Sequence, residues 1–475
     1  MNSRNEKLIK NVILFAIGNI GSKLLQVVLV PLYTRVMTNS EYGTVDLMQA
    51  VVSLLIPIFS FSIFEAVFRY AMEKEYDKNA VYSTGICISA IGALLLCIGG
   101  GIAGAFTDKA FVWLVVANSV AGFFRSLLSQ YTRAVEKTVL FTADNVLLTV
   151  LIMIFNILFI IKLEWGIYGY MLGYILANVC SCIILWAMLG SYRKFSLRLV
   201  TKPLTKELLL FSVPLIPNAV CWWTSSFIDR IIITAVEGEA ANGIYAAGHK
   251  LPSMLTIIVT IFFQAWQMSA NQEFKKSDIS DFYKEIHDQI FSVITLVSSF
   301  MILFCKPITS VFLGEEYFDA WQVMPFLLVA ISFFSFAQFL GSIYSANKKT
   351  SMAFATNLIG VAVSLTFNII LVSVLKVGII GSAIATLCSY FVLWIVRIRD
   401  TGKIVPIKYN VKKMTLATVI LVLQAIVVTV SADTVITYII SGAAFLALIA
   451  IFIKDMLGLV KFGLSFLTKI LKRGA

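Results

Sequence analysis

Basic side chains interrupt several long apolar segments of this sequence, where little water is available to solvate their charges. Four of them lie well inside such segments: Lys23, Arg125, Arg230 and Lys250. An ionisable group at the centre of a membrane-spanning helix costs about 3 kcal/mol on insertion scales, so each is a candidate for function. Guanidinium and ammonium groups replace part of the water around an anion, and arginine does so with two parallel hydrogen bonds. The chemistry that these residues favour is therefore recognition of an anionic substrate within a membrane.

These cations also have structural interpretations that the sequence leaves open. Lys23 could pair with an acid or extend its ammonium group to the membrane surface, and Arg125 could guide an anionic headgroup or reach the surface in the same way. His249, which precedes Lys250, is more often a hydrogen-bonded core histidine than a proton carrier.

Arginine and aspartate recur near the ends of two apolar segments. Arg35 lies near the outer end of the first segment and Arg230 near that of the seventh, and Asp46 and Asp229 are their candidate acid partners. The matching positions of these residues in the two segments are compatible with two walls of one substrate cavity or with two structural ion pairs. The candidate substrate-binding residues are Lys23, Arg35, Asp46, Arg125, Asp229, Arg230, His249 and Lys250.

Other polar residues of the apolar segments carry simpler expectations. Glu65 and Arg69 are four residues apart, which predicts an ion pair along one helix face. Asp144 has no obvious basic partner and could titrate with a coupling ion. Asn156 and Asn368 are expected to tie helices together, since amides between spans commonly do so.

Catalytic and cofactor chemistry finds no support in the sequence. His249 and His287 form no metal or nucleophile constellation, and no phosphate-cradling loop of the Walker type is present. The seven cysteines lie in apolar segments without a C-x-x-C motif, so neither disulfides nor zinc are expected. We therefore expect a protein that is not an enzyme and that needs no cofactor or metal.

The elements that position these residues are membrane-spanning helices. Of 475 residues, 59% are hydrophobic and 13% charged, and the mean hydropathy is +0.90. Runs of about 20 apolar residues indicate transmembrane helices, so the predicted fold class is an all-α integral membrane protein. The first run is too long for a signal peptide and has no clear cleavage site. Fourteen segments are expected to span the membrane: 8–33, 44–68, 80–105, 110–132, 138–161, 167–190, 207–233, 242–268, 286–305, 320–345, 350–374, 378–396, 413–431 and 434–453.

The distribution of positive charge supports this count and gives an orientation. If the N-terminus is cytoplasmic, 29 of the 38 Lys and Arg residues fall in inside loops and termini and 5 in outside loops. Cytoplasmic loops of membrane proteins are enriched in Lys and Arg. Both termini are therefore predicted to be cytoplasmic, and the net charge of +12 is attributed to these loops rather than to nucleic acid binding.

An internal repeat divides the chain. Ala346–Gly381 aligns with Ala134–Gly169 at one constant offset without a gap, with 12 identities in 36 positions. The copies lie six spans apart, and an even number of spans preserves direction, so the halves are predicted to be parallel repeats. The expected organisation has four parts: a six-helix lobe at 1–190, a basic cytoplasmic linker at 191–206, a second six-helix lobe at 207–400, and two further helices with a basic tail at 401–475.

Proline residues predict breaks in two of the spans. Pro214 and Pro217 remove backbone donors from the seventh segment, and Pro57 removes one from the second. Broken helices are tolerated where they line a cavity or move, so the seventh segment is a candidate moving element.

Four stretches resemble a known family. LVPLYTRVMTNSEYGTVDL (29–47), IDRIIITAVEGEAANGIYAAGHKLP (228–252), AWQMSA (265–270) and FLGEEYFDAW (312–321) are similar to the polysaccharide-export flippases, which belong to the multidrug, oligosaccharidyl-lipid and polysaccharide exporter superfamily. The resemblance implies a two-lobed, V-shaped transporter of the bacterial plasma membrane. Its substrate would be an oligosaccharide on a polyprenyl pyrophosphate lipid. It would move this lipid from the inner to the outer leaflet by alternating access, for cell-surface polysaccharide biosynthesis.

The resemblance also implies which groups would meet this substrate. The pyrophosphate would meet the basic residues, and the sugars would meet hydroxyl and amide groups, with polysaccharide polymerase and export machinery as further candidate partners. The amides available are Asn19, Gln26, Asn118, Asn145, Asn156, Asn218, Gln264, Asn357 and Asn368. A cation-coupled multidrug antiporter of the same fold is the alternative, although such a pump favours carboxylates in its helices.

Overall fold

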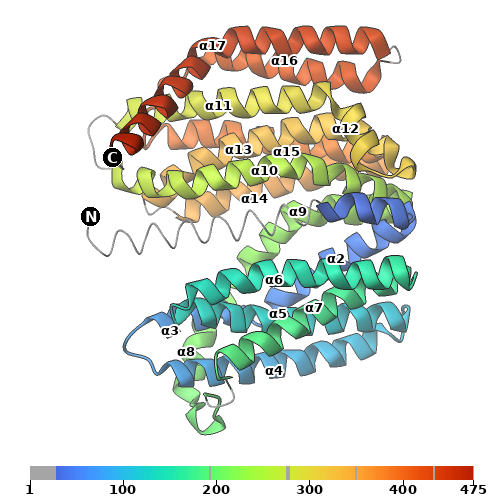
Figure 1. The fold of residues 1–475 in the computed structure, drawn as a ribbon, viewed down its shortest axis with the longest axis vertical. Helices are drawn as coiled ribbons and strands as arrows, with labels where there is room; N and C mark the ends of the chain where they lie inside the picture. Colours follow the sequence, from blue (N-terminus) through green and yellow to red (C-terminus); the bar gives the residue numbers. More distant parts are fainter. Residues whose placement is uncertain (1–27, 192–193, 274–278, 348–349, 432–433, 474–475) are drawn as a thin grey trace. The chain divides into compact units, whose positions relative to one another are not determined.

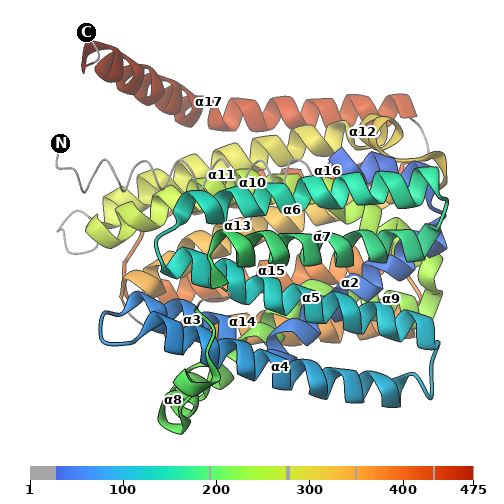
Figure 2. The ribbon, with the colours of Figure 1, turned by 60° about the horizontal axis from the view of Figure 1, so that its bottom comes forward.

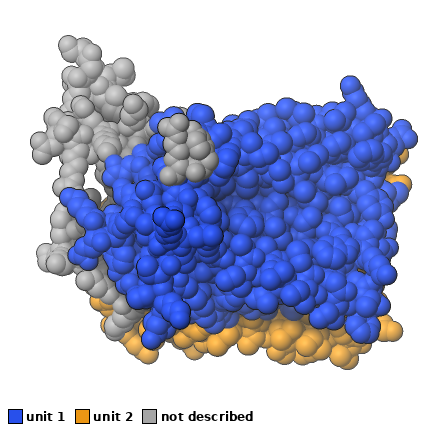
Figure 3. Space-filling view, turned by 90° about the horizontal axis from the view of Figure 1, so that it is seen from below, with its two compact units in different colours: residues 1–231 blue, residues 232–475 orange. Residues whose placement is uncertain are grey.

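The chain is helical apart from its connections. The computed structural model describes residues 28–191, 194–273, 279–347, 350–431 and 434–473, and no β-strand occurs in these ranges (Figure 1). The predicted all-α fold class is therefore confirmed. The chain forms two compact units, Met1–Ile231 and Ile232–Ala475, which Figure 3 shows in separate colours.

The described residues of unit 1 begin with a helical stretch at 28–36. Its helices are α2 (Asn39–Phe59), α3 (Ile63–Met72), α4 (Lys78–Ala103), α5 (Lys109–Ala134), α6 (Thr138–Asn156), α7 (Gly166–Met188), α8 (Lys202–Ser212) and α9 (Ile216–Glu237), the last of which continues into unit 2. In Figure 2, α4, α5, α7 and α6 run side by side, in agreement with the packing of α5 on both α4 and α7 and of α7 on α6.

Unit 2 contains the remaining helices. They are α10 (Glu239–Glu273), α11 (Ile279–Leu303), α12 (Cys305–Phe312), α13 (Met324–Ala346), α14 (Thr350–Asn368), α15 (Ile379–Thr401), α16 (Val411–Val430) and α17 (Thr434–Arg473). Helix α13 is central in this unit, because 83% of its apolar stretch is buried and it packs against α10, α11 and α15. The predicted lobe boundaries follow the internal repeat, whereas the compact units meet within α9, so the lobes and their arrangement stay a prediction.

Twelve helices of the described ranges are long and apolar enough to cross a membrane, and they correspond to twelve of the fourteen predicted segments. The first predicted segment, 8–33, lies mostly outside the described residues. The eighth, 242–268, lies within the 35-residue helix α10, which is not among the twelve. The count of fourteen therefore stays a prediction.

Local signals in the sequence explain where several helices begin. Thr38 and Glu41 form a capping box at the start of α2: the Thr38 amide donates to the Glu41 carboxylate at 2.9 Å, and the Glu41 amide donates to the Thr38 hydroxyl at 3.3 Å. Asp77 and Asp108 accept hydrogen bonds from backbone amides in the first turns of α4 and α5. Such caps satisfy amides that have no partner within the helix.

The two segments in which proline predicts a break, the second and the seventh, are both interrupted. The second predicted segment contains two helices: α2 ends at Phe59, two residues after Pro57, and Phe61 and Ser62 have φ angles of 54° and 49° before α3 begins. The seventh contains a 3-10 turn at Val213–Leu215 between α8 and α9. At the first break, a Cβ on Gly92 of α4 would lie 1.8 Å from the Phe59 carbonyl oxygen, so only glycine fits there.

The internal repeat is reproduced in the backbone. Helix α6 passes at Asn156 into a π-helix, Ile157–Lys162, and α14 passes at the equivalent residue, Asn368, into a π-helix, Ile369–Val374. Glu164 and Lys376, which are also equivalent, then adopt φ angles of 54° and 52°. A shared departure from α-helical geometry at matched positions confirms that the two copies are structural repeats.

Candidate functional site

Buried charges of unit 1 meet at a contact between α9 and α2. The Nε atom of Arg230 is 2.7 Å from Oδ2 of Asp46, and its Nη1 atom is 3.6 Å from Oδ1 of Asp229. The Trp223 indole, seven residues before Arg230 on α9, donates to the Ala50 carbonyl oxygen at 2.7 Å. Because both contacts join α9 to α2, the Asp46–Arg230 ion pair also holds these two helices together.

The guanidinium of Arg230 is held in this place by its own helix as well. Its Nη1 atom donates to the Ser226 carbonyl oxygen at 2.5 Å, and it lies 4.9 Å from the centre of the Phe227 ring. Asp46, Asp229 and Arg230 are all buried. Asp46 and Asp229 were expected as acid partners of Arg35 and Arg230, and the structure places both carboxylates beside Arg230. Contact of these residues with substrate stays a prediction.

A tyrosine cluster lies beside the start of α2 in unit 1. The Asn156 amide donates to the Tyr33 hydroxyl at 2.6 Å, and the Tyr170 hydroxyl donates to that of Tyr174 at 3.4 Å. The Tyr33 ring centre is 5.1 Å from that of Tyr170 and 6.4 Å from that of Tyr42. The expected interhelical role of Asn156 fits this contact, whereas the tyrosines did not emerge from the sequence because no local pattern marks them.

Amide side chains from three helices of unit 1 are also hydrogen-bonded to one another. Asn178 of α7 donates to Asn118 of α5 at 3.2 Å, and Asn118 donates to Gln49 of α2 at 3.4 Å. Each amide carries both donors and acceptors, so these three side chains can exchange their mutual hydrogen bonds for bonds to the hydroxyl groups of a sugar. Asn118 was expected from the sequence, whereas Gln49 and Asn178 were not.

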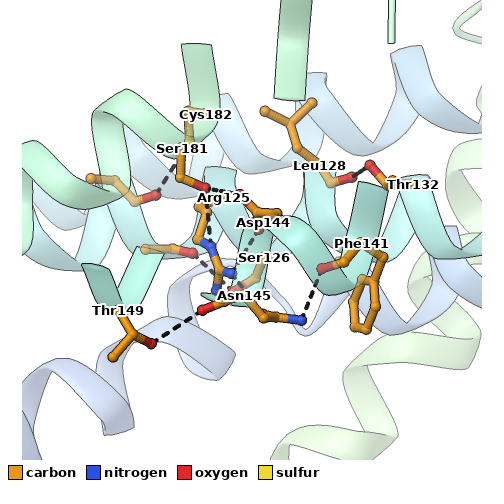
Figure 4. A network of polar contacts seen from close by, with 12 residues as sticks. Arg125, Ser126, Leu128, Thr132, Phe141, Asp144, Asn145, Thr149, Ser181 and Cys182 are labelled. Carbon is orange, nitrogen blue, oxygen red and sulfur yellow. Dashed lines mark hydrogen bonds and ion pairs between the residues drawn. The ribbon is translucent and has the colours of Figure 1, made fainter. Parts of the chain in front are cut away.

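Arg125 is the centre of a second polar network, shown in Figure 4. Its Nη2 atom is 2.7 Å from Oδ2 of Asp144 and donates to Oδ1 of Asn145 at 2.8 Å, and its Nε donates to the Ser181 hydroxyl at 3.3 Å. The Ser181 hydroxyl in turn donates to Asp144. We call Arg125, Asp144, Asn145 and Ser181 the unit 1 clamp, since they join α5, α6 and α7.

The unit 1 clamp corrects one expectation from the sequence. Asp144 does not lack a basic partner: Arg125, nineteen residues earlier, reaches it from the neighbouring helix. The Asp144 side chain is 1% exposed and that of Arg125 is 15% exposed, so their charges are compensated away from water. The role of Arg125 toward a substrate stays a prediction.

Unit 2 contains a matching arrangement, which we call the unit 2 clamp. Arg397 of α15 donates to the Thr356 hydroxyl at 3.2 Å, to Asn357 Oδ1 at 2.9 Å and to the Ala337 carbonyl oxygen at 2.8 Å. Thr356 and Asn357 are the repeat equivalents of Asp144 and Asn145, so the same two positions receive a guanidinium. The sequence assigned Arg397 to a loop because it lies near a helix end, and this was wrong: it is 6% exposed.

The remaining predicted residues are placed as follows. Lys23 lies outside the described residues, and Arg35 is exposed at the end of the helical stretch 28–36. His249 and Lys250 are half-buried on α10 in unit 2, where the His249 ring centre is 6.3 Å from that of Tyr245.

Two further expectations can be compared with the structure. Arg69 does not pair with Glu65. It forms an ion pair at 3.0 Å with Glu73, which lies one helical turn after Arg69 at the end of α3. Among the described residues, no three His, Cys, Asp or Glu side chains gather as metal ligands do.

Comparison with known proteins identifies relatives by sequence. Residues 8–267 match the family described as polysaccharide biosynthesis protein. The Lsg locus putative protein 1 of Haemophilus influenzae is 24% identical over 273 residues, which cover 54% of this chain and 64% of that protein. An uncharacterised membrane protein of Methanocaldococcus jannaschii is 22% identical over 408 residues, which cover 80% of this chain and 95% of that protein.

Solved structures share the fold at low identity. The lipid II flippase MurJ in an inward closed conformation has a TM-score of 0.68 at 14% identity, and the match covers 94% of this chain and all of MurJ. An inward-facing multidrug resistance MATE family transporter of the MOP superfamily has a TM-score of 0.62 at 14% identity, covering 82% of this chain and 94% of that transporter. The chain is thus a multi-pass membrane protein with the fold of this superfamily.

Proposed function

Because this chain belongs to the polysaccharide biosynthesis protein family, we propose that it is a flippase for a lipid-linked oligosaccharide of the bacterial plasma membrane. The lipid would be a polyprenyl pyrophosphate, moved from the inner to the outer leaflet by alternating access, with both termini in the cytoplasm. The observation that carries the proposal is the group of polar side chains in unit 1, where Asp46, the partner of Arg230, lies on the same helix α2 as Tyr42 and Gln49.

The proposed chemistry is an exchange of partners. A pyrophosphate is too strongly charged to enter hydrocarbon bare, and a guanidinium can bind its oxygens with two parallel hydrogen bonds. Arg230 would leave Asp46 for the pyrophosphate, with Lys23, Arg35, Arg125, His249 and Lys250 as further cationic contacts. Hydroxyls of Tyr33 and Tyr174 and the amides of the Gln49–Asn118–Asn178 chain would meet the sugars. The polyprenyl tail needs no polar partner and can remain in the bilayer.

The test of transport is made in cells that lack this protein. Lipid-linked glycan intermediates are quantified, and their sugars are probed from outside the membrane with an impermeant reagent. We expect complete intermediates to accumulate on the inner face and the intact gene to restore their export. Normal outward exposure of the intermediates in these cells, with other flippases deleted, would overturn the proposal.

Charge exchange within the ion pair tests the role of Arg230. Asp46→Arg combined with Arg230→Asp keeps an ion pair between α2 and α9 but moves the guanidinium to the other helix. If Arg230 serves the substrate, the double variant should restore membrane protein levels lost in Arg230→Ala without restoring export. Recovery of export together with protein level would assign the pair a structural role only. Lys23→Ala and Arg35→Ala are expected to lower export with insertion intact.

One observation favours a second candidate, a cation-coupled multidrug antiporter. Two carboxylates, those of Asp46 and Asp229, lie 2.7 Å and 3.6 Å from the single guanidinium of Arg230, which resembles the carboxylate chemistry that an organic cation needs. The same deletion separates the candidates. Loss of resistance to a cationic compound, with normal glycan export, would support the antiporter.

A further inference from the structure

A groove on unit 1 lies beside the ends of α4, α5 and α7. It has a volume of about 520 Å³ and is lined mainly by apolar side chains, among them Ile86, Phe124, Leu128, Ile183, Trp186 and Phe195. Ile183 is 59% exposed and Trp186 is 45% exposed on helix α7, which is apolar enough to span a membrane. An exposed apolar groove on a membrane helix faces hydrocarbon, so its natural filling is a lipid chain.

Residues 194–196, which follow α7 in the chain, are held in place at one end of this groove. The Ser196 amide donates to the Ser83 hydroxyl at 3.0 Å, and the same hydroxyl donates to the Lys194 carbonyl oxygen at 3.4 Å. Ser83 is completely buried on α4. These two bonds hold the backbone on either side of Phe195, whose ring lines the groove, and Lys194 precedes Phe195 directly in the chain.

Two lysines, Lys137 and Lys194, lie near this end of the groove. The Lys194 ammonium is 5.4 Å from the centre of the Tyr131 ring, and the Lys137 ammonium donates to the Met188 carbonyl oxygen at 3.3 Å. Partial burial and then the nearby charge of Lys137 lower the pKa of Lys194. In the described part of the chain neither ammonium forms an ion pair with a carboxylate, so an anion would relieve the repulsion between them.

We propose that this groove binds one anionic phospholipid, with an acyl chain along Phe124, Ile183 and Trp186 and its phosphate at Lys137 and Lys194. A neutral or zwitterionic lipid would fill the groove but would not compensate both lysines. Basic residues near a membrane surface attract anionic lipids, so two lysines confer a measurable preference for anionic headgroups. Bilayer phospholipid is favoured over a lipid-linked glycan as occupant, because it is in large excess in the membrane.

The position of Trp186 provides a direct probe of this site. The full-length protein is reconstituted into dioleoylphosphatidylcholine vesicles that contain a minor fraction of brominated phosphatidylglycerol, or of brominated phosphatidylcholine as the comparison. Bromine quenches tryptophan fluorescence at contact. The chain has eight tryptophans, so the share of quenching due to the groove is the part lost in Trp186→Phe. These vesicles contain no lipid-linked glycan, so the result does not depend on the proposed transport.

We expect Trp186 to be quenched several-fold more strongly by brominated phosphatidylglycerol than by brominated phosphatidylcholine. Lys137→Gln combined with Lys194→Gln should remove this preference while leaving quenching by phosphatidylcholine unchanged. The matched control is Lys74→Gln combined with Lys78→Gln, which removes the same charge from exposed positions at the same end of unit 1 and should keep the preference.

Three results would overturn the proposal. The first is equal quenching of Trp186 by the two lipids in the wild-type protein. The second is a preference that survives in the Lys137 and Lys194 double variant, and the third is a preference that disappears equally in the Lys74 and Lys78 control. If the double variant does not fold, the single variants Lys137→Gln and Lys194→Gln are each expected to lower the preference, and unchanged values in both would contradict the site.

Discussion

The clamps of units 1 and 2 place a guanidinium against equivalent positions but supply it from different helices. In unit 1 the arginine is residue 125 of α5, and the equivalent residue of unit 2 is Ala337. In unit 2 the arginine is residue 397 of α15, and the equivalent residue of unit 1 is Leu185. The repeat therefore preserves a position in space for the guanidinium, rather than a position in the sequence.

The two clamps also differ in charge. Arg125 is bound to the Asp144 carboxylate, whereas the acceptors of Arg397 are the neutral oxygens of Thr356, Asn357 and Ala337. The difference shows that the three-helix junction needs a donor with several N–H groups in one plane, and that a carboxylate is an addition of unit 1. Arginine, with five such donors and a fixed geometry, suits this position better than lysine.

The largest effect is expected from Arg125→Ala, since it leaves the Asp144 carboxylate buried without a counter-charge. Removal of one partner of a buried ion pair costs about 3–5 kcal/mol. The thermal unfolding midpoint of the purified protein in detergent should fall accordingly. A midpoint within experimental error of the wild type would show that the clamp is not a compensated pair.

A second arginine placement tests the equivalence of the clamps. In the background of Arg125→Ala, the further change Leu185→Arg places the guanidinium on α7, where unit 2 has it on α15. We expect recovery of more than half of the lost stability, because the new side chain approaches Asp144 and Asn145 from the position of Arg397. A double variant as unstable as Arg125→Ala would disprove the spatial equivalence. Leu185→Arg alone, which crowds two guanidinium groups, should be destabilising.

Removal of the unit 2 guanidinium should have a smaller effect than its removal from unit 1. Arg397→Leu leaves neutral acceptors without their partner but no buried charge uncompensated, which costs less than an orphaned buried carboxylate. Thr356 keeps its hydroxyl bond to the Ala353 carbonyl oxygen at 3.0 Å, which limits the loss. The unfolding midpoint of Arg397→Leu should therefore lie above that of Arg125→Ala, and the reverse order would contradict the role assigned to charge.

Asp144→Asn converts the unit 1 clamp into one with neutral acceptors, as in unit 2. We expect a loss of about 1 kcal/mol, the difference between a hydrogen bond to a charged acceptor and one to a neutral acceptor. The same unfolding experiment measures it. If Asp144→Asn is as damaging as Arg125→Ala, charge balance rather than acceptor geometry holds unit 1 together. The complementary change Thr356→Asp should be tolerated in unit 2, since Arg397 would gain a carboxylate partner.

The smallest effect is expected at the exposed ion pair of unit 1. The side chain of Arg69 is 64% exposed and that of Glu73 is 35% exposed, and pairs of this kind contribute about 0–1 kcal/mol. Arg69→Ala should leave the unfolding midpoint nearly unchanged. This variant serves as the control for loss of an arginine elsewhere in unit 1. A large decrease in its unfolding midpoint would show that the assay responds to any loss of positive charge rather than to loss of a clamp.

Much of the fold was predictable from the sequence by itself, because the responsible signals act locally. Hydropathy located twelve helices that the structure shows to be long and apolar enough to cross a membrane, since an apolar run of sufficient length has few alternatives to a membrane helix. Pro57, Pro214 and Pro217 indicated the two breaks, because proline removes a backbone donor wherever it stands. The repeat, with its paired π-helices after Asn156 and Asn368, followed from a single offset.

The partners of the charged residues were decided only by the tertiary structure. Arg125 meets Asp144 and Ser181, nineteen and fifty-six residues away, and Arg230 meets Asp46 across the length of unit 1. Arg397 lies close to a helix end, and counting charges therefore assigned it to a loop, although α13 and α14 bury it. The physical reason is that hydropathy and proline act through the chain's own neighbours, whereas charge compensation depends on which helices pack together and on how their faces are turned.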